Sequence, residues 1–418
     1  TRWREDATCD NWGLFCFVRD LAEGSYWSST HQPTLRSGDS YEAIFSEGRA
    51  EYRRRDKDFE TYSEIVVSSE DDIELRRTRI TNRSRSRRSI EVTSYAEVVL
   101  APAAADSLHP AFSKLFVQTE IVRERQAILC QRRPRSDNEA ALCLFHLMAV
   151  HGADVQATSY ETDRMAFIGR TRSINAPAAM DQDARLGESQ GPVLDPCIAI
   201  RHRILLEPLQ TVTLDLVIGV AEQRSSALAL VDKYRDRHLA DRVSELAVTH
   251  AWVNLQQINA TEGDAQVFAR LASSVIYANP AQRAASAVLA RNRRGQSGLW
   301  GYGISGDLPM VLLQISSLDN IELVRQLVQA HAYWRLKGLA VDLVIWNEDH
   351  AGYRQALQEQ ILGMIAAGIE ANFTDRPGGI FVRLAEQMSS EDRTLFETVA
   401  RVIISDTRGT LKEQAERR

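Results

Sequence analysis

Cysteine is scarce in this sequence and follows no pairing pattern. Only five cysteines occur among 418 residues, at Cys9, Cys16, Cys130, Cys143 and Cys197. Their number is odd, their spacing is wide and none forms a C-x-x-C pair, so neither a disulfide framework nor a zinc site of that type is supported. We expect reduced, mostly buried thiols and no metal site.

Lysine is almost absent. Five of the 50 basic residues are lysines and 45 are arginines, and 56 acidic residues bring the net charge to −6. A negative net charge argues against a nucleic-acid binder defined by bulk charge. The densest basic run, Arg76–Arg88, holds seven arginines and no acid. Because acidic residues flank it on both sides, the run favours a solvated sheet face or an oligomer contact over a polyanion site.

Long apolar runs are missing as well. The longest, Ala140–Val150 and Val212–Ala221, are interrupted, and they fall below the roughly 18 apolar residues that a membrane-spanning helix requires. We therefore predict no direct membrane insertion. The composition, 44% hydrophobic and 25% charged, is that of a globular protein. The chain starts at Thr1 without a signal segment, and we interpret it as a soluble piece of a longer protein.

Residues from about 41 to 220 show a period of two. Segments rich in β-branched and aromatic residues alternate with polar turns, which predicts a large antiparallel β-sandwich over residues 1–222. The periodicity leaves the strand order open. The predicted strands are Phe59–Ser68, Ile73–Thr81, Ser89–Leu100, Ala127–Gln131, Ala141–Val150, Cys197–Leu206 and Thr211–Ala221.

The period changes after residue 222. Apolar residues at helical spacing predict a helical linker over 223–298, with helices through Ile258 and over Asp264–Ala278. Strands and helices then alternate over 299–408, which predicts a small α/β domain with a parallel sheet. Residues 409–418 read as a polar tail. The predicted strands of the α/β domain are Met310–Ile315, Val341–Trp346, Ile380–Leu384 and Arg401–Ser405.

Polar residues follow the strands of the α/β domain. Asn347, Glu348 and Asp349 come directly after a buried strand, and the carboxyl ends of parallel strands are the usual place for a ligand. Such positions are also polar simply because they open loops and cap helices. The segment Gly301–Gly306 loosely spells G-x-G-x-x-G but precedes a strand, so it predicts no dinucleotide site and no cofactor.

A second group of candidate residues is aromatic and polar. Trp27, His31 and Gln32 lie before the predicted sandwich strands, and Trp300, Tyr302 and Asp307 follow the linker. Indole and phenol rings can stack on sugar faces while the polar side chains bind hydroxyls, which predicts a carbohydrate subsite. In the alternative interpretation, Trp27 and Trp300 are anchors of the core or of a domain interface.

No catalytic set is visible in the sequence. G-x-S-x-G and H-E-x-x-H are missing. A glycosidase needs two carboxylates about 5 to 10 Å apart, and the sequence cannot nominate such a pair among its acids.

Several segments together resemble the bacterial cyclic β-1,2-glucan synthases, in a stretch of their C-terminal half that is related to cellobiose and chitobiose phosphorylases. The resemblance covers essentially the whole chain. Its motifs include Thr1–Asp6 (TRWRED), Tyr26–Thr34 (YWSSTHQPT), His109–Ser113 (HPAFS), Leu299–Pro309 (LWGYGISGDLP) and Val341–Glu348 (VDLVIWNE).

The resemblance implies a sandwich of galactose-mutarotase type within a glycosyltransferase that uses UDP-glucose and resides in the bacterial inner membrane, with this region cytoplasmic. The family's general-acid Asp lies in a helical barrel that has no counterpart here, so no catalytic position carries over. The leading hypothesis is a non-catalytic module that supports or binds β-1,2-glucan, beside neighbouring domains, during synthesis of cyclic periplasmic glucans. The alternatives are an active phosphorylase-type or transglycosylating unit and a scaffold that touches no sugar.

Overall fold

The computed structural model describes residues 12–134, 142–349 and 354–417. The chain divides into two compact units, Thr1–His250 and Ala251–Arg418. The helices predicted as a linker over 223–298 are shared between these units. The motif at Thr1–Asp6, Cys9 and the predicted start of a strand at Ala141 lie outside the described residues.

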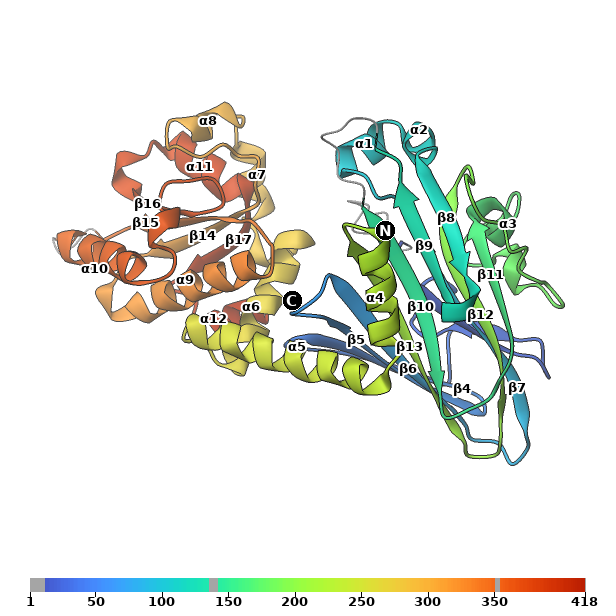
Figure 1. The fold of residues 1–418 in the computed structure, drawn as a ribbon. Helices are drawn as coiled ribbons and strands as arrows, with labels where there is room; N and C mark the ends of the chain where they lie inside the picture. Colours follow the sequence, from blue (N-terminus) through green and yellow to red (C-terminus); the bar gives the residue numbers. More distant parts are fainter. Residues whose placement is uncertain (1–11, 135–141, 350–353, 418) are drawn as a thin grey trace. The chain divides into compact units, whose positions relative to one another are not determined.

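Two antiparallel sheets build the first unit (Figure 1). One has five strands in the order β11-β12-β7-β1-β2, and the other has eight in the order β3-β4-β5-β6-β13-β10-β9-β8. The strands are β1 Phe15–Asp20, β2 Tyr26–Ser28, β3 Ser40–Ser46, β4 Arg49–Asp56, β5 Phe59–Val67, β6 Ile73–Asn82, β7 Arg88–Glu97, β8 Val117–Val122, β9 Ala127–Arg132, β10 Cys143–His151, β11 Val155–Asp163, β12 Pro196–Leu206 and β13 Thr211–Ala221. Short helices α1 Ala103–Leu108, α2 Pro110–Lys114 and α3 Arg164–Ile168 lie between strands.

Alternation along the strands creates the core between the sheets. Val18 and Val92 of the five-stranded sheet pack with Ile80 and Leu214 of the eight-stranded sheet in one buried cluster. A buried histidine also joins the sheets, because His146 Nε2 on β10 lies 2.8 Å from Ser94 Oγ on β7. This arrangement confirms the predicted sandwich.

The first strands of the sandwich lie earlier in the chain than the strands that the sequence predicts within it. Trp27 was expected to precede the sandwich strands, but it lies on β2, which pairs with β1, and β1 pairs with β7. All six residues of β1 are buried. A strand covered on both faces shows no polar alternation, and the period-two signal is therefore absent there.

Each sheet has a second buried face. Helices α4 Arg224–Tyr234 and α5 Arg237–Gln257 place Val231 and Val243 against the outer face of the eight-stranded sheet, beside Leu75 and Val217. On the five-stranded sheet, Phe17 packs with Phe167 of α3 in a separate cluster. The arginines predicted to form a solvated face or an oligomer contact lie on β6, in the turn after it and at the start of β7. Most of them are ion-paired, as in Arg76–Glu74 and Arg83–Glu60 at 2.5 Å each.

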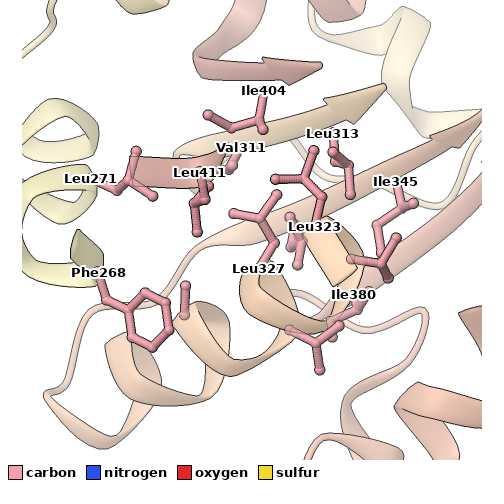
Figure 2. Packing of buried hydrophobic residues seen from close by; sticks show 14 of the residues in the cluster. Phe268, Leu271, Val311, Leu313, Leu323, Leu327, Ile345, Ile380, Ile404 and Leu411 are labelled. Carbon is pink, nitrogen blue, oxygen red and sulfur yellow. The ribbon is translucent and has the colours of Figure 1, made fainter. Parts of the chain in front are cut away.

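The second unit contains a four-stranded parallel sheet in the order β16-β15-β14-β17. Figure 2 shows Leu313 and Ile345 of the sheet packing near Leu323 and Leu327 of the following helix. This sheet confirms the predicted parallel α/β domain. Its elements are α6 Glu262–Ile276, α7 Ser286–Arg291, α8 Ser297–Trp300, β14 Met310–Ile315, α9 Ile321–Leu336, β15 Asp342–Asn347, α10 Arg354–Ala367, β16 Ile380–Leu384, α11 Ser390–Val399, β17 Ala400–Ser405 and α12 Leu411–Ala415.

Helices cover both faces of this sheet. Residues of α6, α9, α10 and α12 share one buried cluster, and residues of α8 and α11 share the other. Helix α12 lies in the segment expected to be a polar tail. Thr410 and Glu413 form a capping box at its start, and Leu411 is buried. Two apolar residues in a five-residue segment give little helical periodicity, so the sequence did not indicate this helix.

A buried charged group joins α9 to the segment after α10. Glu370 Oε2 lies 2.6 Å from His331 Nδ1, and its Oε1 accepts from Arg335 Nη2 at 2.7 Å. Burial opposes ionisation of this carboxyl, but the hydrogen bonds from His331 and Arg335 outweigh it and lower the pKa of Glu370. The carboxylate therefore stabilises the folded state fully above its unfolded pKa of about 4.3, and the stabilisation is lost as the pH falls through the lower folded pKa.

We expect the second unit to lose stability as the pH falls below about 4.3, and we expect Glu370→Gln to lose less over the same pH range. Urea denaturation at several pH values, followed by fluorescence, measures the difference. A variant whose stability falls as steeply as that of the unchanged chain would contradict the assignment to Glu370.

Candidate functional site

A cavity of about 470 Å³ opens on the inner face of the eight-stranded sheet, near the β3 edge. We call it the aromatic pocket, and its lining includes Trp12, His31, Gln32, Tyr41, Tyr52 and Arg76. Tyr52 pairs with Ser63, and Ser63 with Thr78, so these residues share the face that carries Ile80 into the core between the sheets. The pocket is thus an extension of the sandwich interior at its open edge.

The wall that carries His31 and Gln32 is a loop fixed by short hydrogen bonds. Ser28 Oγ donates to Thr30 O at 2.7 Å, and Thr30 Oγ1 donates to Gln32 O at 2.7 Å. Serine and threonine side chains favour such turns because they bond to nearby backbone. The Gln32 Oε1 atom is buried without a hydrogen-bond partner among the described residues. A buried unsatisfied acceptor is costly, and a donor from a ligand would relieve it.

The opposite wall is aromatic. Tyr41 and Tyr52 stack with ring centroids 6.4 Å apart, and Phe45 meets Tyr52 edge-on at 6.1 Å. The Tyr41 hydroxyl accepts from the His31 backbone N–H at 3.3 Å, which joins the two walls. Tyr41 is 41% exposed although it is a large aromatic residue. Rings held at a pocket wall with one face toward solvent form a surface on which a flat apolar ligand face can stack.

The polar groups of the pocket include basic, phenolic and amide groups. Its described lining residues carry one guanidinium, one imidazole and two phenols, and none carries a carboxylate. Cleavage of a glycosidic bond by the usual route requires a carboxylic acid beside the scissile oxygen. The pocket can therefore stack and hydrogen-bond a sugar, but its own described lining supplies no such acid.

Trp27, His31 and Gln32, which were predicted to contribute to one carbohydrate subsite, do not line the same cavity. His31 and Gln32 line the aromatic pocket, whereas Trp27 is 5% exposed and packs against Phe59 with ring centroids 5.6 Å apart. Trp27 is thus a core anchor at the edge of a different, smaller cavity. Sequence reasoning missed Tyr41 and Tyr52. The period-two signal that begins at Tyr41 could have indicated the first, whereas Tyr52 joins it only through the pairing of β3 with β4.

The predicted residues of the second unit lie around the turn before β14. Trp300 is 64% exposed, and its Nε1 donates to Ser305 O at 3.3 Å. Asp307 accepts from Gln296 at 3.0 Å, and the Tyr302 hydroxyl donates to Asp392 at 2.9 Å. These contacts fix the turn, and a sugar-binding role for Trp300, Tyr302 and Asp307 stays a prediction.

The strand-end residues make local contacts. Asn347 Oδ1 accepts from the Asp349 backbone N–H at 3.0 Å, its Nδ2 donates to Gln358 at 3.3 Å, and the Glu348 backbone N–H donates to Ile315 O at 2.7 Å. Both Asn347 and Asp349 are buried. These polar groups end β15 and begin the next loop. This agrees with the alternative interpretation of the sequence, in which such residues are polar because they open a loop. A ligand-binding role for them stays a prediction.

The point where the strand order reverses, between β14 and β17, holds a carboxylate of the chain itself. Asp406 Oδ2 accepts from Ser316 N at 2.8 Å, from Ser316 Oγ at 3.0 Å and from Ser317 N at 3.2 Å. Ligands of open α/β sheets commonly bind at such a point through these backbone groups. Asp406 thus already satisfies the donors that an anionic ligand would use.

The described residues hold neither a metal-binding cluster nor a membrane-spanning helix. No group of three or more His, Cys, Asp or Glu side chains among them could hold a metal ion. No helix in the described part of the chain has the length and apolar character needed to cross a membrane.

The sequence of the chain matches a known protein family. Residues 1–237 match the family described as "Glycosyl hydrolase 94, supersandwich domain". The chain is 31% identical over its full length to the cyclic beta-(1,2)-glucan synthase NdvB of Rhizobium meliloti (strain 1021), of which it covers 15%. It is 25% identical over 225 residues, 52% of its length, to the solabiose phosphorylase of Paenibacillus borealis, of which it covers 27%. The chain thus spans only a small part of these relatives.

A bacterial glucoamylase in complex with acarbose aligns with 62% of this chain and 35% of its own, at a TM-score of 0.38 and 8% identity.

Proposed function

The chain belongs to the glycosyl hydrolase 94 family through its supersandwich domain, and we propose from this that it is the glucan-binding module of a larger β-1,2-glucan synthase. Similarity to NdvB over the full length of the chain supports the choice of glucan. The chain covers only 15% of that relative. That this chain belongs to a larger enzyme that synthesises β-1,2-glucan is therefore also proposed. We also propose that the parent is anchored in the bacterial inner membrane, with this region cytoplasmic, in the synthesis of cyclic periplasmic glucans.

The aromatic pocket is the observation that carries the proposal. Stacked Tyr41 and Tyr52 offer ring surface, Gln32 Oε1 offers a buried acceptor, and His31 and Arg76 offer polar groups at the same cavity. A glucosyl unit presents an apolar face and a rim of hydroxyl donors, and these features match both walls. With no carboxylate among its described lining residues, the pocket favours binding of the polymer over cleavage.

We expect linear β-1,2-glucooligosaccharides to bind the chain, and we expect Tyr52→Ala and Tyr41→Ala each to weaken binding at least about tenfold. Tyr41→Phe keeps the ring and should retain most of the affinity. Isothermal titration calorimetry of the four proteins measures these differences.

Trp300→Ala is the matched control, because it removes an exposed aromatic ring from the other unit. If Trp300→Ala lost affinity for the oligosaccharides and Tyr52→Ala kept it, the sugar site would lie at the turn before β14 and not at the aromatic pocket. Absence of heat with every oligosaccharide would favour a scaffold that touches no sugar. Release of glucose 1-phosphate from the oligosaccharides in phosphate buffer would support the phosphorylase-type alternative and contradict a non-catalytic module.

A further inference from the structure

A second cavity of the first unit, of about 500 Å³, lies on the outer face of the five-stranded sheet. We call it the arginine pocket, and the residues that matter are Arg19, Glu91, Asp183, Arg185, Arg201 and Arg203. Strand register builds its floor. Arg19 on β1 stands opposite Glu91 on β7, and Glu91 stands opposite Arg203 on β12, so three charged side chains form one row across three strands. The face is the one that carries Phe17, opposite to the core between the sheets.

The floor carries more positive than negative charge. Glu91 Oε2 lies 3.3 Å from Arg19 Nη1 and 3.6 Å from Arg201 Nη1, and its Oε1 accepts from Arg203 Nη2 at 2.8 Å. Three guanidinium groups thus share one carboxylate. At the rim lie Arg185 and two acids: Glu188, which is ion-paired with Arg123 at 2.7 Å, and Asp183, whose charge also acts on Arg19.

This excess charge is largely buried. The side chains of Arg19, Glu91 and Arg201 are 4%, 7% and 5% exposed. Burial lowers the pKa of Arg201 to about 10 and lowers the pKa of Arg19 as well, because a guanidinium away from water is costly unless its charge is balanced. A bound anion would supply the missing balance.

Some guanidinium donors on the floor of the pocket are left without a partner. Arg19 Nε is buried without a hydrogen-bond partner among the described residues. Arg201 is held in place by Thr93 Oγ1 at 2.9 Å and by the carbonyl oxygens of Ala184 and Ala179 at 2.8 and 2.5 Å. A guanidinium has five N–H hydrogens, so these contacts leave Arg201 further donors. The arginine pocket is therefore prearranged, and its donors are not exhausted.

We propose that the arginine pocket binds a phosphate group, either free or as the monoester of a small sugar. On the floor, three guanidiniums face one carboxylate, and the lining as a whole, with four arginines and three acids, stays positive. A phosphate carries about −1.5 to −2 at neutral pH and so has the charge that this lining attracts. Arginine forks pair with phosphate oxygens through paired N–H bonds. The cavity volume exceeds the needs of a bare phosphate and leaves room for a monosaccharide. The site is on a different sheet face from the aromatic pocket and does not depend on the proposed glucan binding.

Titration calorimetry with inorganic phosphate and with glucose 6-phosphate, at constant sodium chloride, tests the proposal on the whole chain. We expect at least one of them to bind with a Kd below about 1 mM, and a tighter sugar phosphate would identify the monoester as the source. Arg203→Gln should weaken binding at least about tenfold, and it should fold because Arg203 is half exposed. Arg201→Met, which fills the buried space, should abolish binding.

Arg83→Gln is the matched control, since it removes one arginine and one ion pair from the same unit away from this pocket. Its affinity should equal that of the unchanged chain. Absence of heat with both probes, or an equal loss in Arg83→Gln and Arg203→Gln, would overturn the proposal, because the latter result would reflect overall charge alone. Tyr52→Ala should leave phosphate binding unchanged, which separates this site from the glucan site.

Discussion

Replacing Asp215 with alanine should lower the free energy of unfolding of the first unit by about 3–5 kcal/mol. Asp215 lies on β13 directly opposite Arg77 on β6, and it accepts from Arg77 Nε at 2.7 Å and from Nη2 at 2.9 Å. The side chains are 0% and 7% exposed. The hydrogen bond with Asp215 raises the pKa of Arg77 above its usual value, against the effect of burial. Without the carboxylate, a buried guanidinium loses its principal partner.

Asp241 on α5 provides the control, because it contacts the same guanidinium but is 41% exposed. Asp241→Ala should cost less than about 1 kcal/mol, as exposed ion pairs do. Urea denaturation of both variants measures the contrast. The double variant Arg77→Met, Asp215→Leu should recover much of the loss by replacing charges with apolar contacts. Equal costs for Asp215→Ala and Asp241→Ala would contradict the assignment of the stability to the buried half of the pair.

The sequence predicts a strand most clearly where apolar and polar residues alternate over a long segment. The predicted strand Ile73–Thr81 corresponds to β6, where Ile73, Leu75 and Ile80 are buried among polar neighbours. The same reasoning missed β1, because burial on both faces removes the alternation that reveals a strand. Strand order was also beyond reach, since register depends on pairing between segments that lie far apart in the sequence.

The candidate sites show the same limit. His31 and Gln32 were recognisable as polar residues beside aromatics, but Trp27 could not be told from a surface ring until β2 was known to pair inside the sandwich. The arginine pocket joins residues 72 and 112 positions from Glu91, which no local pattern connects. Local sequence therefore indicates which residues can do chemistry, and the sheet register decides which of them meet.

Gly379→Ala should destabilise the second unit by about 3 kcal/mol or more. Gly379 closes the turn that leads into β16: its N–H donates to Arg376 O at 2.9 Å, and its carbonyl accepts from Leu343 N at 2.9 Å. A methyl group there would lie 1.8 Å from Phe373 O and 2.9 Å from Arg376 O. Both obstacles are backbone atoms, which cannot swing aside as a flexible side chain can. The turn must open, and the pairing of edge strand β16 with β15 is weakened at that end.

Gly363→Ala is the same substitution in the same unit and should have the opposite sign. Gly363 lies within helix α10, and nothing stands within 4 Å of the position its methyl group would occupy. Alanine in a helix interior is favoured over glycine by about 0.5–1 kcal/mol, so this variant should be slightly more stable than the unchanged chain. Thermal and urea unfolding of both variants, with hydrogen exchange at Leu343, test the contrast. If Gly379→Ala unfolded like the unchanged chain, the close approach of the 373–376 backbone to Gly379 would not exist in solution. Faster exchange at Leu343 in Gly379→Ala alone would locate the loss at the β15–β16 pairing, because the Leu343 N–H is the donor to Gly379 O.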